Sequence, residues 1–432
     1  MSATATTPWI PIQRVQGREQ LDSRGRPTLA VTVTLDEGTS AHAGVPSGAS
    51  TGSAEAVELR DGDPHRYGGA GVQNAIANLT GPIAEAITGR EFTGLQDMDL
   101  TLRELDGTHT LSRLGGNAIV GVSMAAARAQ AQAAGLPLWQ ALTGDGVEPR
   151  LPVPHFNVVN GGAHAANDLD FQEFMIAPLG VPSLPEAIRA GAEVYAALKG
   201  LLHSCGLATG LGDEGGFAPD LAQPEQVLTL LVKAIEDAGY EPGRGGVAIA
   251  LDPAANGFYV EGRYRVAGRD LSSAELVALY AELIDQFPIW SIEDGLAEND
   301  RDGWTHLTHT LGHQVQLVGD DIFVTDPSKI DDAARYGIAN AALIKLNQIG
   351  TVSHTLAALE VCRHRGYAAM ISHRSGETTD TFIADLAVGS GCGQLKSGAP
   401  ARGERVAKYN RLLDIAADQP ELPFGIADRS GH

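Results

Sequence analysis

Residues Phe287–Asp320, FPIWSIEDGLAENDRDGWTHLTHTLGHQVQLVGD, contain two short apolar runs that each end in an acidic residue. Glu293 ends the first run and Asp320 ends the second, and a helical stretch lies between them. The interval of about 27 residues is the length that a strand, a helix and two short loops require. The segment therefore predicts one strand–helix–strand unit of a parallel sheet.

The same pattern recurs on both sides of this unit. Further apolar runs end in an ionisable residue in four segments: VAIALD at Asp252, AALIK at Lys345, AAMISH at His373 and GCGQLK at Lys396. Two acidic positions extend the series upstream, Glu214 in GLGDEGG and Glu173 in QEFMI, and an apparent hairpin at residues 257–266 interrupts it. Repeated units over about 280 residues predict a (β/α)8 barrel.

The ionisable residues that end these runs are expected to form a single site. In such barrels the carboxyl ends of the strands converge around one axis, and active sites lie at that end. Capping of the following helix accounts for one or two of the acidic residues. It does not account for Lys345 and Lys396, because an ammonium group cannot accept a hydrogen bond from a backbone N–H.

The start of the chain has a different pattern. Residues 10–45 alternate apolar and polar side chains, most regularly in TLAVTVTL at residues 28–35. Turn-forming residues stand at 23–25 and 36–38. The alternation predicts a three-stranded antiparallel meander.

Helices and a domain boundary are expected after the meander. Apolar residues recur at helical spacing in the alanine-rich segments 72–89 and 117–135. The segment GDGVEPRLPVP, at residues 144–154, is rich in Gly and Pro and is typical of a boundary. We therefore expect an α+β domain at residues 1–143 and the barrel at residues 144–432.

Composition excludes several classes of function. The chain has 432 residues, 31 Lys+Arg against 53 Asp+Glu and a formal net charge of −22, so a surface for nucleic acid or anionic membrane is not expected. Three cysteines are too few for a disulfide framework, and no signal peptide or membrane span is recognisable, so a cytoplasmic location is expected. Only six of the cationic residues are lysines, which matters because an ammonium group can lose its proton whereas a guanidinium cannot.

Three short motifs suggest other chemistries and are set aside. The GASTG motif at residues 48–52 matches a nucleophile elbow, but Pro46 precedes it where a strand is required. The GLGDEG motif at residues 210–215 matches a dinucleotide fingerprint, but its acidic residues would repel a pyrophosphate. Three histidines share one predicted helix without a further metal ligand, at His306, His309 and His313, so a polar helix face is the preferred interpretation.

The remaining cluster is acidic and rich in oxygen. Asp252, Glu293 and Asp320 come from three successive barrel strands and offer hard oxygen ligands, which suit Mg²⁺ better than zinc or iron. Two lysines and His373, from the following strands, would face the metal. Surface carboxylates without a common role would not each end an apolar strand.

Over nearly its whole length the chain resembles the enolase family. The resemblance rests on ten segments: GREQLDSRGRPT (17–28), PSGASTG (46–52), NGGAHAANDLDFQEFMI (160–176), GDEGGFAP (212–219), ALD (250–252), SIEDGL (291–296), GDDIFVT (319–325), LIKLNQIG (343–350), ISHRSGETTD (371–380) and GQLKSGAPAR (393–402). It implies an enolase-type (β/α)8 barrel that begins with two antiparallel strands and two helices. It also implies a hydro-lyase of glycolysis and gluconeogenesis that reversibly dehydrates 2-phospho-D-glycerate to phosphoenolpyruvate.

The resemblance also implies roles for individual residues. Asp252, Glu293 and Asp320 match the ligands of a tightly bound Mg²⁺, and Ser50 matches the ligand of a second Mg²⁺ that arrives with substrate. Lys345 matches the base that removes the proton from C2. The acid that protonates the departing C3 hydroxyl is matched by Glu214, with Glu173 and His164 around the leaving group. Residues that hold the substrate carboxylate and phosphate are matched by His373, Arg374, Ser375 and Lys396.

The chemistry sets requirements on two of these residues. A free lysine has a pKa of about 10.4, and bringing Lys345 near 7 requires a shift of roughly 3 units, or about 4 kcal/mol. Nearby cations such as Mg²⁺ and Lys396 would supply it. As the acid, Glu214 needs a raised pKa, and a neighbouring carboxylate such as Glu173 would raise it.

Two other functions remain as alternatives. Another member of the same superfamily would act on a different carboxylate, such as a sugar acid, but the Ser50 loop and the SHRSGE segment argue for a phosphorylated substrate. A non-catalytic binding role at a cell surface would be an additional activity at most. The resemblance further implies a homodimer or a larger homo-oligomer, and a secondary surface or secreted location.

Overall fold

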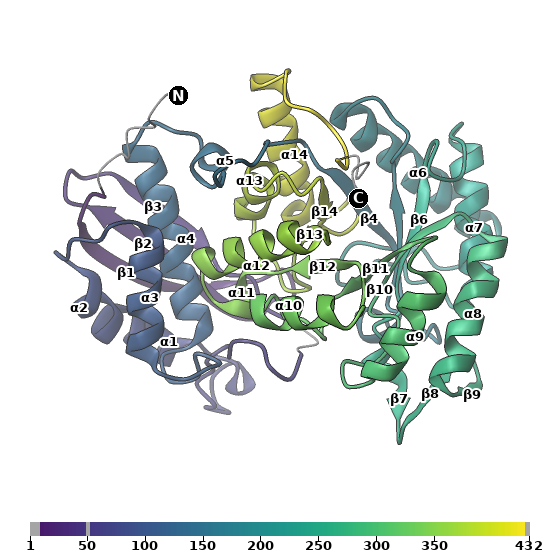
Figure 1. Ribbon diagram of the computed structural model, residues 1–432, viewed down its shortest axis with the longest axis horizontal. Helices are drawn as coiled ribbons and strands as arrows, with labels where there is room; N and C mark the ends of the chain where they lie inside the picture. Colours follow the sequence, from purple (N-terminus) through teal and green to yellow (C-terminus); the bar gives the residue numbers. More distant parts are fainter. Residues whose placement is uncertain (1–8, 49–51, 428–432) are drawn as a thin grey trace.

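The computed structural model describes residues 9–48 and 52–427. It begins with an antiparallel sheet of three strands, drawn in purple in Figure 1: β1 (Ile12–Leu21), β2 (Pro27–Leu35) and β3 (Ser40–Gly44). The register pairs Gly17 with Val31 and Val31 with Ala43, and tight turns join the strands. The meander predicted from the alternation is confirmed.

Helices cover one side of this sheet. They are α1 (Gln73–Asn78), α2 (Ala84–Ile87), α3 (Leu95–Asp106), α4 (Gly116–Ala133) and α5 (Leu138–Ala141), with a 3₁₀ turn η1 (Tyr67–Gly69) before them. The single helix expected at residues 72–89 is divided, because Pro82 lies in a π-helical turn, η2 (Leu79–Ile83), between α1 and α2. Proline has no N–H to donate and its ring clashes with the preceding turn, which explains the break.

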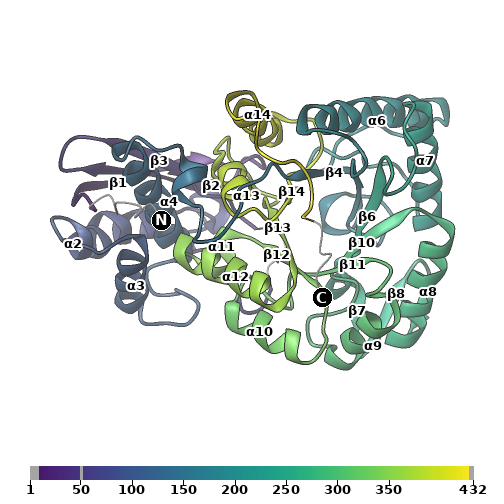
Figure 2. The same cartoon turned by 45° about the horizontal axis from the view of Figure 1, so that its top comes forward.

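Helix α4 lies between the sheet and the second part of the molecule (Figures 1 and 2). It contacts β2 and β3 on one side and the barrel helices α11 (Leu346–Ile349) and α12 (Val352–Arg365) on the other, so nearly all of its side chains are buried. A Cβ atom at Gly121 would lie 2.5 Å from Val31 Cγ2. Glycine and the many alanines of α4 therefore permit the close approach of helix and sheet.

A buried carboxylate joins the two parts across this contact. Asp99 Oδ2, on α3, accepts hydrogen bonds from Ser123 Oγ at 3.0 Å and from the backbone N–H of Ser353 at 2.9 Å. Ser123 Oγ in turn accepts one from the N–H of Val352 at 2.9 Å. These bonds satisfy N–H groups at the start of α12 that have no partner within the helix. Burial raises the pKa of Asp99 to about 6.

The second part of the chain is a closed barrel of eight strands. In chain order they are β4 (Val153–Asn160), β5 (Glu173–Ala177), β6 (Ala248–Asp252), β10 (Ile289–Glu293), β11 (Gln316–Gly319), β12 (Ala341–Ile344), β13 (Ala368–Ser372) and β14 (Gln394–Lys396). Strand β5 runs antiparallel to both of its neighbours, whereas the other pairs are parallel. The barrel therefore starts as the family resemblance implies and differs from a regular (β/α)8 barrel.

Helices surround the barrel (Figure 2). Besides α11 and α12 they are α6 (Leu184–Ser204), α7 (Pro224–Asp237), α8 (Ser273–Gln286), α9 (Arg301–Leu311), α10 (Pro327–Arg335), α13 (Phe382–Gly389) and α14 (Gly403–Asp418). The expected hairpin is confirmed as β7 (Tyr259–Val260) and β8 (Arg263–Val266), and β9 (Arg269–Leu271) adds a third strand. Two 3₁₀ turns, η3 (Gly162–His164) and η4 (Ala255–Phe258), follow barrel strands.

The chain between α5 and β4 contains no regular helix or strand. We propose the boundary between the two domains there, after residue 143. In the described residues, no helix is long and apolar enough to cross a membrane.

Candidate active site

The strand ends place the predicted ionisable residues at one rim of the barrel. Asp252, Glu293 and Lys396 are the last residues of β6, β10 and β14. The first residues after β11, β12 and β13 are Asp320, Lys345 and His373. Because these strands are parallel, all six positions lie at the same end.

Two acidic residues reach this rim differently from the expectation. Glu173 does not end a strand but begins β5, and because β5 is antiparallel its first residue pairs with Asp252 at the same rim. Glu214 lies in a loop between α6 and α7 that pairs through Phe217 with the end of β4. The interpretation that both extend the series of strand ends is wrong, although both residues belong to the cluster.

Lys396 is the centre of a group of buried carboxylates. Its Nζ lies 2.9 Å from Asp252 Oδ2, 2.8 Å from Glu293 Oε1 and 3.1 Å from Glu173 Oε2. Burial alone would lower the pKa of Lys396, but Asp252, Glu173 and Glu293 together raise it well above its usual value. One ammonium faces three acidic side chains, so carboxyl groups outnumber cationic groups in this part of the rim.

Lys345 makes a separate ion pair on the same rim. Its ammonium donates to Asp320, and its backbone N–H donates to Thr325 Oγ1 at 2.9 Å. The other Asp320 oxygen accepts a hydrogen bond from Gln348 Nε2 at 2.8 Å. Burial opposes the charged form, yet Asp320 raises the pKa of Lys345 above its usual value. The lowered pKa expected for this base depends on bound Mg²⁺ and stays a prediction.

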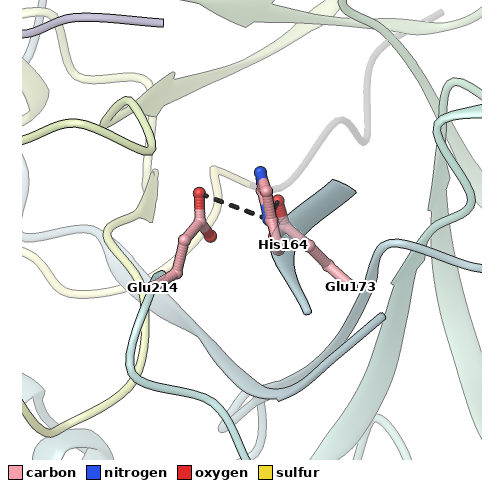
Figure 3. Close-up of side chains that lie close together, drawn as sticks. All are labelled: His164, Glu173 and Glu214. Atoms are coloured by element: carbon pink, nitrogen blue, oxygen red, sulfur yellow. Dashed lines mark ion pairs between the residues drawn. The ribbon is translucent and has the colours of Figure 1, made fainter. Parts of the chain in front are cut away.

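Glu173, Glu214 and His164 form a further group at the rim, and Figure 3 shows the three side chains close together. Glu173 belongs to β5, which lies across the barrel from β12, the strand before Lys345. The Nδ1 atom of His164 lies 3.7 Å from Glu173 Oε1 and 3.7 Å from Glu214 Oε1. Glu214 Oε2 accepts a hydrogen bond from Asn157 Nδ2 at 3.0 Å and lies 3.1 Å from His373 Nε2. The two carboxyl groups thus share one histidine and have different further partners.

The electrostatics of these two carboxyl groups differ in direction. Burial and the nearby Glu214 raise the pKa of Glu173 well above its usual value. Burial also acts on Glu214, but His373 and His164 lower the pKa of Glu214 well below its usual value. The pKa of Glu214 is therefore lowered and not raised as expected, and Glu173 is the member of the pair whose pKa is raised.

Arg374 and Ser375 follow His373 in a loop that faces the first domain. Arg374 Nη1 lies 2.9 Å from Glu55 Oε2 and 2.8 Å from Asn347 Oδ1. Ser375 Oγ accepts a hydrogen bond from Arg24 Nη1 at 3.5 Å. The first domain therefore contributes charged residues to the site. Ser50, the predicted ligand of a second metal ion, lies outside the described residues.

The donor set fits a hard divalent cation. Glu293 Oε2 is buried without a hydrogen-bond partner, and burial and Asp252 raise the pKa of Glu293 well above its usual value. Carboxylate oxygens of Asp294, Asp320 and Asp321 also lie within 4.8 Å of one another. Burial and Asp320 raise the pKa of Asp321 to about 7. These carboxylates outnumber the nearby cations and offer only oxygen as donor, which suits a hard divalent cation such as Mg²⁺.

The motifs that were set aside play no part in this cluster. In the described part of the chain, no group of metal-ligating side chains includes His306, His309 or His313, which are exposed on and after α9. The GLGDEG motif forms a turn and does not open a helix. Three residues of the GASTG motif lie outside the described residues.

Several residues that contact the site were not predicted from the sequence. Asn157 is a polar residue inside the apolar strand VPHFNVVN, and that contrast is a usable signal. Glu55, Gln348 and Arg405 stand in loops or helices where charged and polar residues are ordinary. Their partners lie far away in the sequence: Glu55 and Arg374, for example, are 319 positions apart.

The fold is a closed barrel that carries a buried group of acids, lysines and histidines at its carboxyl rim. Residues of a preceding α+β domain complete this group. These features define a barrel enzyme for acid–base chemistry assisted by a divalent metal. Two family models match the chain, "Enolase, N-terminal domain" over residues 12–142 and "Enolase, C-terminal TIM barrel domain" over residues 148–422. The chain belongs to the enolase family. This confirms the resemblance and the fold class expected from the sequence.

Individual relatives agree with the family models. A protein named Enolase from Rubrobacter xylanophilus is 56% identical over 406 residues, which cover 94% of each chain. One of the same name from Acidothermus cellulolyticus is 56% identical over 404 residues, again 94% of each chain. The similarity therefore includes both domains and not the barrel alone.

Proposed function

We infer that this chain is a hydro-lyase that reversibly dehydrates 2-phospho-D-glycerate to phosphoenolpyruvate, a step of glycolysis and gluconeogenesis. The observation that carries the inference is the opposition of Lys345 on one side of the rim to the Glu173, Glu214 and His164 group on the other, with Lys396 and its carboxylates between them. The reaction needs a base for the proton on C2 and an acid for the hydroxyl on C3. The similarity over 94% of the chain to proteins named Enolase supports the same reaction.

Asp252, Glu293 and Asp320 are proposed as ligands of one Mg²⁺ ion, and Ser50 as a ligand of a second that arrives with substrate. The first set is supported by the unpartnered buried oxygen of Glu293 and by the excess of carboxylates. When bound, the metal supplies positive charge that stabilises the negative charge developing on the substrate carboxylate.

Lys345 is proposed as the base that takes the C2 proton. In the structure it donates to Asp320, which stabilises its protonated form. It can accept a proton only after it has lost one, so this ion pair must open before the reaction. Glycine could not replace Lys345 because it has no side chain to reach the substrate. Arginine could not replace it because a guanidinium does not lose its proton.

The Glu173 and Glu214 pair is proposed to hold and deliver the proton for the departing C3 hydroxyl. The histidine neighbours lower the pKa of Glu214, whereas burial and Glu214 raise the pKa of Glu173. A carboxyl group with a raised pKa is the suitable acid for this step, and Glu173 is the member of the pair whose pKa is raised. His164 bridges both carboxyls and is placed to orient them.

Arg374, Ser375, Lys396 and His373 are proposed to hold the substrate phosphate and carboxylate. Arg374 is suited to a phosphate because its planar guanidinium donates in a fork. In the structure that fork is directed at Glu55, so a bound phosphate must share or displace this carboxylate. A homodimer or larger homo-oligomer and a cytoplasmic location, with a secondary surface or secreted one, are proposed from family resemblance.

The test is to add 2-phospho-D-glycerate to the purified protein and to follow the absorbance of phosphoenolpyruvate. We expect product with Mg²⁺ and none with EDTA. No product under either condition would overturn the inference. Turnover of a sugar acid in place of the phosphorylated substrate would support a different member of the superfamily.

A further inference from the structure

Arg405 is a fully buried cation that the reaction does not use directly. It lies in the first turn of α14, beneath the site, and its nearest carboxylate oxygen is Glu404 Oε1 at 3.4 Å from Nε. Its Nη1 atom lies 2.7 Å from His373 Nδ1 and 2.6 Å from the carbonyl oxygen of Arg374. Its Nη2 atom lies 2.7 Å from the carbonyl oxygen of Ser375. Arginine at this depth is costly unless its donors are used.

The contact with His373 allows only one assignment of the ring protons. A guanidinium is always protonated in proteins and donates without accepting. The Nδ1 atom of His373 must therefore accept, and it carries no proton. A neutral ring then has its only proton on Nε2, which lies 3.1 Å from Glu214 Oε2.

We propose that Arg405 is a positioning residue that holds His373 in the neutral form with its proton on Nε2, facing the Glu214 carboxylate. In the other neutral form, a ring lone pair would face Glu214 and an N–H would face the Arg405 guanidinium. In the doubly protonated form, the Nδ1 proton would again point at that guanidinium. Both alternatives place groups of like polarity against each other in a buried space.

The surroundings support this arrangement independently. Burial, opposed by Glu214 and reinforced by Arg405, lowers the pKa of His373 to about 4. Gly398 lies beside the Arg405 side chain, and a Cβ atom there would meet Arg405 Cδ at 3.0 Å and the Glu214 carbonyl oxygen at 2.6 Å. The absence of a side chain at Gly398 therefore lets the guanidinium stem pass between the two loops.

Arg405 also ties together the loops that carry the reacting groups. Besides Arg374 and Ser375 it binds the carbonyl oxygen of Asp213 at 3.1 Å, and Asp213 directly precedes Glu214. A single guanidinium thus fixes the backbone on both sides of the contact between His373 and Glu214. The consequence for catalysis rests on the proposed function, because that function assigns proton delivery to the Glu173 and Glu214 pair, whereas the ring assignment does not rest on it.

The test is a nitrogen NMR spectrum of the full-length protein labelled with ¹⁵N in the histidine rings, with the His373→Gln variant used to identify the signals of this ring. We expect one unprotonated Nδ1 and one protonated Nε2, unchanged between about pH 5 and 8. A protonated Nδ1 in the wild-type protein would overturn the proposal, whatever the variants do.

Three variants separate positioning from general stability. Arg405→Met removes all donors, so His373 should sample both neutral forms. Its pKa should rise above about 4 because Arg405 no longer opposes the protonated ring, although burial still lowers it. Arg405→Lys retains a charged donor and should restore the wild-type ring signals. The matched control is Lys408→Met, which removes a neighbouring buried cation of α14 that binds Glu377 and not His373. Wild-type ring signals in folded Arg405→Met would overturn the proposal.

Activity gives a second and distinguishable readout. In Arg405→Met, kcat should fall about 10- to 100-fold, the size of effect seen when a partner that orients an active-site histidine is lost. The pH profile of Arg405→Met should show the ionisation of His373 at a higher pH than in the wild-type protein, a shift that Lys408→Met should lack. If the wild-type protein shows the expected ring signals and does not turn over 2-phospho-D-glycerate, the proposed function fails while the ring assignment stands.

Discussion

Metal binding at the carboxylates around Lys396 should raise the thermal stability of the protein by a predictable amount. A ligand that binds only the folded state, at a concentration 100 times its dissociation constant, stabilises that state by about 2.7 kcal/mol. At about 2.1 cal/mol/K per residue, the entropy of unfolding is about 0.9 kcal/mol/K for all 432 residues. Saturating Mg²⁺ should therefore raise Tm by about 3 °C, or by about 5 °C if residues 148–422 unfold alone.

The assay is differential scanning calorimetry in Mg²⁺ and in EDTA at constant ionic strength. Because the net charge of −22 attracts cations without a specific site, the result needs two variants. Asp252→Asn removes a proposed ligand at nearly constant volume and should abolish the shift. Asp145→Asn removes one charge at an exposed position and should retain it. Equal shifts in the two variants, or no shift in the wild-type protein at saturating Mg²⁺, would refute the assignment of these ligands.

Three further outcomes are expected. Lys345→Ala should abolish turnover and the exchange of the C2 proton with solvent while substrate still binds, as measured by proton NMR; exchange at the normal rate would identify a different base. Lys396→Met should lower the free energy of unfolding in urea by about 3–5 kcal/mol, because it leaves buried carboxylates unpaired, and a loss below about 1 kcal/mol would contradict the ion-pair geometry. In the folded state Asp99 keeps its proton up to a pH of about 6, whereas in the unfolded chain it loses the proton near pH 4. The contribution of Asp99 to the free energy of unfolding therefore falls by about 3 kcal/mol as pH rises through that interval. Asp99→Asn should therefore gain stability relative to the wild-type protein between pH 4 and 6, and a difference in urea unfolding that does not change with pH would contradict the raised pKa.

The parts of the fold that the sequence predicted depend on local patterns. The alternation of residues 28–35 is enough to identify β2, and apolar runs that stop at Asp252 and Glu293 mark the ends of β6 and β10. The periodicity of apolar residues does not show whether a strand runs parallel or antiparallel to its neighbours. The antiparallel direction of β5 follows from its neighbours in the barrel, and so the place of Glu173 at the start of that strand was not predicted by its pattern.

The charge states of the site depend on distances that no sequence pattern contains. Lys345 directly follows one barrel strand and Lys396 ends another, yet the Lys345 ammonium has a single carboxylate partner and the Lys396 ammonium has three. The pKa of Glu214 is lowered because two histidines lie near its oxygens, His373 at 3.1 Å and His164 at 3.7 Å. Identifying the residues was therefore possible from the sequence, whereas assigning their protons required the structure.

The long separation between Glu55 and Arg374 has a consequence for the synthesis of the chain. The two residues are 319 positions apart, and at about 5–20 residues per second the ribosome needs on the order of 15 to 60 s to add the second after the first. During this time the first domain is present without the loop that it binds. The His373–Arg374–Ser375 loop is in turn held by Arg405, near the end of the chain. A chain released before this last helix is made therefore lacks the guanidinium that holds this loop.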